Sequence, residues 1–413
     1  MKVVFSRKEL ILFILLFTSV DTILFGTNQN VLFNYIPRVI SLLGIVALLP
    51  KRRLKKDKTL FTCIVMLLIV CLSNYIYSTD FGTTVSRVLV ILVAFSIVSS
   101  YSIKEFFNIY DTFMYFVSVI AIFLYILTLM LPSLVRHLPT ITNMANSQFY
   151  TCVLSSISAE SVNRVYIPRA SGIFWEAGAF AIYLVIAIFY QLFVFDKIRI
   201  SRLCVYLIAL LLTFSTTGFV ATAMLIFTFT FTNKNKGKYN LLIRFIALFL
   251  VIIIVGLFFL GSNTVIYQTL FGKIVNREST ALTRYASFIV PFRIVMDFPL
   301  LGVSAGRISD FMRSYALQPG LFGVLQASAM CTNTIAYQFG TYGVVMGIIF
   351  IFGTWKFTYK FSGKRNIIAM GLFLTFFFAY FGENFFSFFP YLYVFYGFKN
   401  IETKSINLSD IMK

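Results

Sequence analysis

The chain has few of the residues from which enzymes most often build a catalytic centre. Its 413 residues include one histidine, His137, and 15 acidic residues against 35 lysines and arginines. A single histidine makes a serine–histidine–acid triad unexpected. The sequence also lacks a cysteine–histidine cluster, an Asp-x-Asp pair and a Walker-type phosphate loop, which are the usual signs of metal or nucleotide sites. We therefore expect chemistry without a metal and without a cofactor.

Soluble domains are lacking as well, because no polar stretch is long enough to build a second core. Hydrophobic residues make up 59% of the chain and charged residues 12%, and the mean hydropathy is +0.88. This composition is typical of an integral membrane protein. Apolar runs reach helical length and show no strand-period alternation, so the predicted fold class is all-α, a polytopic membrane helical bundle.

We expect a single integral membrane domain over residues 1–413, with about 12 transmembrane helices. Each expected span is an apolar run of roughly the length that a bilayer requires, and the shortest form close pairs. The expected spans are 10–27, 31–50, 59–78, 84–101, 109–131, 175–195, 203–217, 219–232, 241–261, 332–354, 366–382 and 384–398.

The net charge of +20 is explained by topology and not by nucleic-acid binding. Of the 35 lysines and arginines, 24 fall in the termini and in short loops on one side of the expected spans. Such loops are cytoplasmic by the positive-inside rule, and they contact anionic lipid headgroups. We therefore place both termini in the cytoplasm.

Two long connections, about 132–175 and 262–331, lie on the external side in this topology. Loops of this length are uncommon unless they are functional or disordered, and both contain aromatic and aliphatic residues throughout. Eight of their nine cations are arginine, whose planar fork binds phosphate or carboxylate in a bidentate manner. The external loops therefore predict an anion-binding site.

Arg169 and Glu176 stand directly before an uncharged span that begins at Ala177. A charge that faces lipid costs about 3 kcal/mol or more, so both side chains must face water, each other or a charged ligand. Arginine and carboxylate together suit a substrate with a diphosphate leaving group. The arginine neutralises the departing charge, and the carboxylate accepts the proton of an attacking hydroxyl. A structural ion pair between the two residues is the alternative.

Four segments, taken in order, resemble motifs of the O-antigen and capsular polysaccharide repeat-unit polymerases, the Wzy-type family related to O-antigen ligases. The resemblance covers about 165–350, and the order and placement of the segments around the spans carry it. The segments are Arg169-x-x-Gly172-x-Phe174-x-Glu176, Thr213-Phe-Ser215-Thr-Thr-Gly218, Arg284 with Asp297-Phe-Pro299-Leu-Leu-Gly302-Val-Ser-Ala-Gly306, and Asn333 with Gly340-Thr-Tyr-Gly343-Val-Val-Met-Gly347.

The resemblance implies a membrane glycosyltransferase at the external face of the inner membrane. Such enzymes transfer a glycan chain from its polyprenyl diphosphate carrier to an incoming lipid-linked repeat unit, and they act beside a flippase and a chain-length regulator. Arg169 and Arg284 inherit the role of the arginines in the two external loops, and we expect Glu176 to act as the base. An O-antigen ligase, or a flippase or transporter of the same lipid-linked oligosaccharide, are the alternatives.

Five further residues are candidates for substrate binding. Arg277 and Arg284 are seven residues apart, so on a helix they share a face. Arg307 follows Gly302 in a glycine-containing loop that suits a flexible cradle, and Glu383 is a second external carboxylate. Arg293 is also a candidate, although its spacing from Asp297 favours an ion pair.

Two arginines and two cysteines have structural interpretations. Arg38 and Arg87 fall inside expected spans; we expect Arg38 to pair with Asp21, and Arg87 to extend to the external membrane surface. Cys152 and Cys331 lie one in each external loop, and the sequence leaves open whether they form a disulfide.

Overall fold

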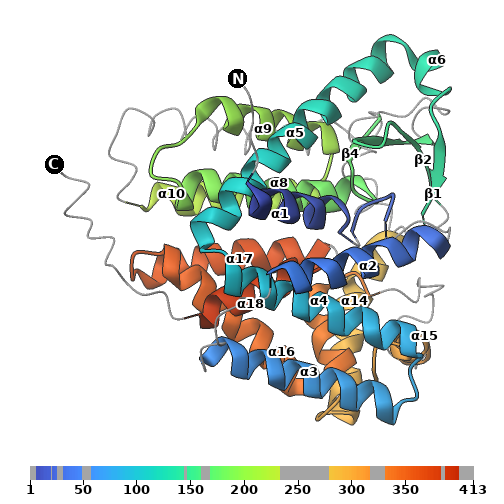
Figure 1. The fold of residues 1–413 in the computed structure, drawn as a ribbon, viewed down its shortest axis with the longest axis vertical. Helices are drawn as coiled ribbons and strands as arrows, with labels where there is room; N and C mark the ends of the chain where they lie inside the picture. Colours follow the sequence, from blue (N-terminus) through green and yellow to red (C-terminus); the bar gives the residue numbers. More distant parts are fainter. Residues whose placement is uncertain are drawn as a thin grey trace.

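The computed structural model describes residues 6–19, 21–25, 31–48, 57–143, 147–159, 168–232, 279–316, 331–382 and 387–399. The chain is mostly helical, as predicted, and its long helices run in roughly the same direction (Figure 1). Within the described residues, five helices are long and apolar enough to cross a membrane: Lys58–Ile76, Phe81–Ser100, Ile103–Met130, Ala177–Val194 and Thr334–Phe361. The total of about 12 spans stays a prediction.

Short polar motifs mark the start of four of the first five helices. The five are α1 (Arg7–Phe17), α2 (Val31–Leu48), α3 (Lys58–Ile76), α4 (Phe81–Ser100) and α5 (Ile103–Met130). Ser6 and Ser102 start α1 and α5 with capping boxes, in which a glutamate three residues later bonds back to the cap. Asp57 and Asp80 start α3 and α4 by accepting backbone N–H groups of the first turn.

The centre of the bundle is α8 (Ala177–Phe189), which continues into a π-helical turn, η1 (Tyr190–Val194). Every residue of both elements is buried. A helix that is apolar on all sides is enclosed by other helices, and α8 packs against α5, α9 (Ile200–Thr213) and α10 (Thr216–Thr230). The 14 residues of α9 extend about 21 Å, less than the roughly 30 Å core of a bilayer.

The second half of the fold contains α14 (Ser279–Asp297), α15 (Ile308–Ala316), α16 (Thr334–Phe361), α17 (Asn366–Gly382) and α18 (Phe389–Phe398). Helices α16, α17 and α18 pack on one another, and α18 contacts α4. Because α14 and α15 fall inside 262–331, the second expected loop contains helices where the structure describes it.

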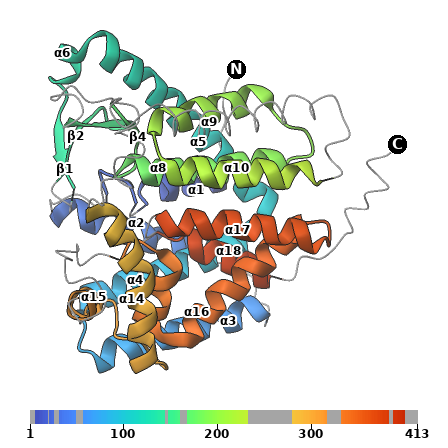
Figure 2. The same ribbon diagram turned by 180° about the vertical axis from the view of Figure 1, so that it is seen from behind.

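The first expected loop contains a short helix, α6 (Pro132–Val135), and a four-stranded antiparallel sheet in the order β1-β2-β3-β4. The strands are β1 (Thr140–Thr142), β2 (Gln148–Thr151), β3 (Ser156–Ser158) and β4 (Ala170–Gly172). Strands of three or four residues are too short to show alternation in the sequence, so the helical prediction missed them. Figures 1 and 2 place α6, the sheet and α15 at one end of the bundle, which we call the sheet end.

The first expected span, 10–27, is wrong as a continuous helix, because α1 ends at Phe17. The chain then turns and pairs with the segment that follows β4: the Ile23 N–H donates to the Ile173 carbonyl at 2.9 Å, and the Trp175 N–H donates to the Asp21 carbonyl at 3.2 Å. This strand-like pairing supplies hydrogen bonds that a helix would otherwise have provided.

A loop docks on α16 through backbone atoms at the sheet end. The backbone N–H groups of Val303 and Ser304 donate to the carbonyls of Gly340 and Thr341 at 3.1 and 2.9 Å. The helix is interrupted at Gly343, where φ is 84°, and Gly302 also has a positive φ of 59°. A Cβ atom at Gly302 would lie 2.5 Å from the Gly340 carbonyl oxygen. This position therefore requires glycine, both for its positive φ and for the lack of space for a side chain.

We predict that Gly302→Ala destabilises the protein more than Gly363→Ala. Both glycines have φ of 59°, which costs an alanine about 1–2 kcal/mol. A Cβ at Gly363 meets no atom within 4 Å, whereas at Gly302 overpacking adds about 1–3 kcal/mol. Thermal unfolding of the two variants in the same detergent measures the difference, and equal melting temperatures would contradict the docking of the loop on α16.

Candidate functional site

Arg169 joins two segments that lie more than 40 residues apart in the sequence. Its Nε donates a hydrogen bond of 2.8 Å to the Thr213 carbonyl, at the last residue of α9. A cation is favourable at a helix C-terminus, where carbonyl groups lack helical partners. The chain then turns through Phe214, in the left-handed conformation, to Ser215, which caps α10. The first two motif segments therefore contact each other through Arg169.

Glu176 is the N-cap residue of α8, in an extended conformation and half-buried. Its carbonyl accepts the first helical hydrogen bond, from Phe180 at 3.2 Å. Among the described residues, its side chain makes no capping bond to the helix, and the Arg169 Nε bond goes to Thr213. The carboxylate thus lies at the N-terminus of α8, the positive end of the helix dipole.

The other two motif segments also contact each other, through the loop that docks on α16. Gly302, expected to bind substrate, is buried in this contact, and its small size lets the two backbones approach. Thr79, before α4, reaches the same loop: its hydroxyl lies 2.7 Å from the Ser304 hydroxyl. The structure thus gives Gly302 a structural explanation that does not require a ligand.

The loop also has a Gly-x-Ser-x-Gly spacing centred on Ser304, the pattern of the nucleophile turn in many serine hydrolases. Ser304 has a positive φ of 70°, as such turns often do. Its side chain is fully buried, however, and its hydroxyl bonds to Thr79. His137 lies just after α6, exposed, so the spacing reflects backbone packing and does not form a triad.

Arg293, on α14, and Arg307, just before α15, are both exposed. The expected ion pair between Arg293 and Asp297 is not among those of the described residues; the Asp297 carboxylate instead accepts a hydrogen bond from the Tyr315 hydroxyl. Burial, followed by this hydrogen bond and the carboxylate charge, raises the pKa of Tyr315 to about 12, so Tyr315 remains a donor at neutral pH.

The remaining predicted site residues are only partly placed. Arg284 lies in α14, with its backbone alone described. Arg277 and Glu383 fall outside the described residues.

The sequence analysis missed a cluster of polar side chains inside the bundle. The Asp21 carboxylate, which is buried, accepts a hydrogen bond of 2.6 Å from the Tyr183 hydroxyl. Tyr183 Oη also lies 3.0 Å from Ser387 Oγ. Arg87 donates to Tyr337 Oη at 3.2 Å and interacts electrostatically with Asp21.

Asp21 was therefore paired with the wrong arginine in the sequence analysis. Arg38 lies with its guanidinium carbon 5.1 Å from the Tyr35 ring centroid and acts on Asp80. Hydrogen bonds from Thr83 lower the pKa of Asp80, and the charge of Arg38 makes a smaller contribution in the same direction. The error follows from the first expected span, because Asp21 belongs to the turn that pairs with residues 173–175 and not to a helix beside Arg38.

A second buried polar cluster surrounds Asp111 on α5, near the start of α9. The carboxylate of Asp111 is fully buried and accepts hydrogen bonds from Arg202, from Gln191 in η1 and from Tyr206. Arg199 lies 3.6 Å away. Several donors around one buried carboxylate satisfy it fully, so we interpret this cluster as structural, joining α5, η1 and α9.

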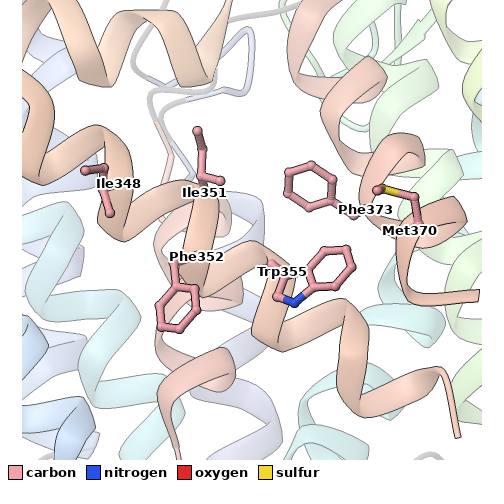
Figure 3. A pocket seen from close by; sticks show the side chains of 6 residues that line it. All are labelled: Ile348, Ile351, Phe352, Trp355, Met370 and Phe373. Atoms are coloured by element: carbon pink, nitrogen blue, oxygen red, sulfur yellow. The ribbon is translucent and has the colours of Figure 1, made fainter. Parts of the chain in front are cut away.

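A groove between α16 and α17, with a volume of about 370 Å³, offers no chemical group (Figure 3). It is lined by apolar side chains, among them Phe352, Trp355 and Phe373, and Phe352 is 47% exposed. In the described part of the chain, no group of three or more metal-binding side chains comes together. The polar chemistry of the described residues therefore lies at Arg169, Glu176 and the two buried clusters.

No family model and no curated protein matches the chain.

We predict that Cys152 reacts with a maleimide in the folded protein and Cys331 does not. Both are free thiols; Cys152 is exposed, whereas burial raises the pKa of Cys331 to about 12. Only the thiolate reacts, so Cys331 stays unreactive from pH 7 to 9 and becomes labelled after denaturation. Mass spectrometry of a variant that retains only Cys152 and Cys331 measures both sites. Labelling of Cys152 that requires a reductant would show instead that the two thiols are bonded.

Proposed function

We propose that the protein is a membrane glycosyltransferase that polymerises polyprenyl-diphosphate-linked oligosaccharide repeat units. The observation that carries the proposal is the hydrogen bond from Arg169 to the end of α9, which joins the first two motif segments; Glu176, in the first of them, is the residue at which α8 begins. The contact between the loop at 298–304 and α16 joins the other two segments. The four segments that resemble the family's motifs therefore contact each other in pairs, the first with the second and the third with the fourth.

The proposed orientation places the sheet end outside the inner membrane, with both termini in the cytoplasm. The two expected external loops contribute α6, the sheet, α14 and α15 there, while the described basic connections from η1 to α9 and from α16 to α17 lie at the opposite end (Figure 1). This orientation follows the positive-inside rule. It gives the arginines access to a lipid-linked substrate that a flippase has delivered to the external leaflet, and to a chain-length regulator.

In the proposed reaction, a hydroxyl oxygen of the incoming repeat unit attacks the anomeric carbon of the growing chain. The bond from this carbon to the carrier diphosphate breaks, and the diphosphate leaves with the electron pair. The proton of the hydroxyl passes to the Glu176 carboxylate. Arg169 and Arg284 stabilise the negative charge that develops on the leaving diphosphate, which requires no metal.

We predict that Arg169→Ala and Arg284→Ala each reduce polymerisation about 100- to 1,000-fold, the usual effect of removing a group that stabilises transition-state charge. Arg169→Lys has little more polymerisation activity than Arg169→Ala, because an ammonium group does not reproduce the guanidinium geometry. The length distribution of the surface polysaccharide in complemented cells measures the effect.

Arg313→Ala is the matched control, because Arg313 is an exposed arginine on α15 at the sheet end. Normal chain lengths with Arg169→Ala and Arg284→Ala would remove the support for a polymerase. Single repeat units that accumulate inside the cell would favour a flippase, and full-length chains that stay on the carrier would favour a ligase.

We predict that Glu176→Gln lowers kcat about 100- to 10,000-fold, the contribution typical of general acid–base catalysis, with little change in KM. Glutamine has the same size but cannot accept the proton. Chain elongation by purified protein, followed at several substrate concentrations, separates the two constants. An unchanged kcat would leave Glu176 with only its role at the start of α8.

A further inference from the structure

Arg87 lies six residues after the start of α4, inside a helix long enough to cross the membrane. Its guanidinium donates to Tyr337 Oη at 3.2 Å, with the guanidinium carbon 5.6 Å from the Tyr337 ring centroid. Asp21, Tyr342 and Tyr391 also interact with it electrostatically. An ionisable residue in a membrane helix is costly and is usually functional, so this arginine needs an explanation beyond packing.

A structural ion pair with Asp21 is the simplest alternative for Arg87. The Asp21 carboxylate also accepts a hydrogen bond of 2.6 Å from the Tyr183 hydroxyl, and Tyr183 in turn contacts Ser387. Tyr183 thus orients the Asp21 carboxylate, whose charge acts on Arg87. The planar guanidinium of Arg87 has five N–H donors in a fork that matches two phosphate oxygens.

Ten buried side-chain polar atoms have no hydrogen-bond partner among the described residues, and two of the ten lie beside this cluster. They are Oε1 of Gln338 and the hydroxyl of Tyr342. Tyr342 is fully buried and interacts electrostatically with Arg87, and Gln338 bonds through its side chain to Tyr391. Unsatisfied buried polar groups are costly and rare in native proteins. An anionic ligand bound to Arg87 would supply an oxygen that accepts a hydrogen bond from the Tyr342 hydroxyl, and this hydroxyl would then have a partner.

The cluster is continuous with the first motif segment. The Tyr183 ring stacks on Phe174 with 4.1 Å between centroids, and the Trp175 N–H donates to the Asp21 carbonyl at 3.2 Å. Arg87, Tyr183 and Tyr337 each lie within the first two turns of α4, α8 and α16.

We propose that Arg87, with Tyr337 and Tyr342, binds one of the two phosphates of a polyprenyl diphosphate, namely the phosphate nearer to the lipid tail. This proposal rests on the proposed function and adds a binding residue within the membrane to the arginines of the external loops. The long arginine side chain brings its charge towards the headgroup level, where the phosphates of a membrane-anchored carrier lie. Asp21 and Tyr183 act as positioning residues: Asp21 balances the charge of Arg87, and the Tyr183 hydroxyl orients the Asp21 carboxylate.

The test measures binding of farnesyl diphosphate, a short polyprenyl diphosphate, to the purified full-length protein in detergent, with farnesyl monophosphate and farnesol as comparisons. We expect the diphosphate to bind most tightly and farnesol most weakly. Arg87→Gln weakens diphosphate binding about 10- to 100-fold, as expected for a lost charge-assisted hydrogen bond. Arg87→Lys has a smaller effect, and Tyr337→Phe weakens binding about 3- to 10-fold. Arg38→Gln, the matched arginine of α2, leaves binding unchanged.

Three outcomes would overturn the proposal: no binding of the diphosphate to the unaltered protein, equal binding of farnesol, or unchanged binding by Arg87→Gln. If Arg87→Gln does not fold, Arg87→Lys and Tyr337→Phe carry the same test. Loss of polymerisation in Arg169→Ala together with unchanged diphosphate binding in Arg87→Gln would sink this proposal alone. Arg87-dependent binding without any chain elongation would sink the polymerase and retain the site.

Discussion

The fold depends on the enclosure of α8, because this helix is buried along its whole length and the polar groups of the molecule are arranged at its two ends. Tyr183, near its start, bonds to Asp21 and Ser387, and Gln191, in its π-helical end, bonds to Asp111. A bilayer offers no water to satisfy such groups, so each end must be completed by polar side chains from other helices. The packing of α8 therefore decides where charge is tolerated inside the bundle.

The sequence predicted the helices well where apolar runs and caps agree. The expected spans 59–78, 84–101 and 109–131 lie within three residues of α3, α4 and α5 at all but one end, since α5 starts six residues earlier, at its Ser102 capping box. It failed for 10–27, because hydropathy does not distinguish an apolar helix from an apolar segment that pairs like a strand. The small sheet was missed for a related reason, since its strands are too short to have a period.

The candidate site was predictable in its residue types and not in its contacts. The position of Arg169 and Glu176 before a span showed that both need polar surroundings, and the structure places them at the ends of two helices. Nothing in the spacing shows that Arg169 reaches Thr213, or that Asp21 faces Arg87 and not Arg38. Those contacts depend on how distant helices pack, which local periodicity does not encode.

The docking of the loop at 298–304 has a consequence for how this part of the protein can change in evolution. The loop is held on α16 by main-chain N–H and carbonyl groups, and the close approach depends on two glycines. The side chain of Leu300 takes no part in these bonds and is 75% exposed. Neighbouring side chains can therefore change while the course of the backbone stays the same.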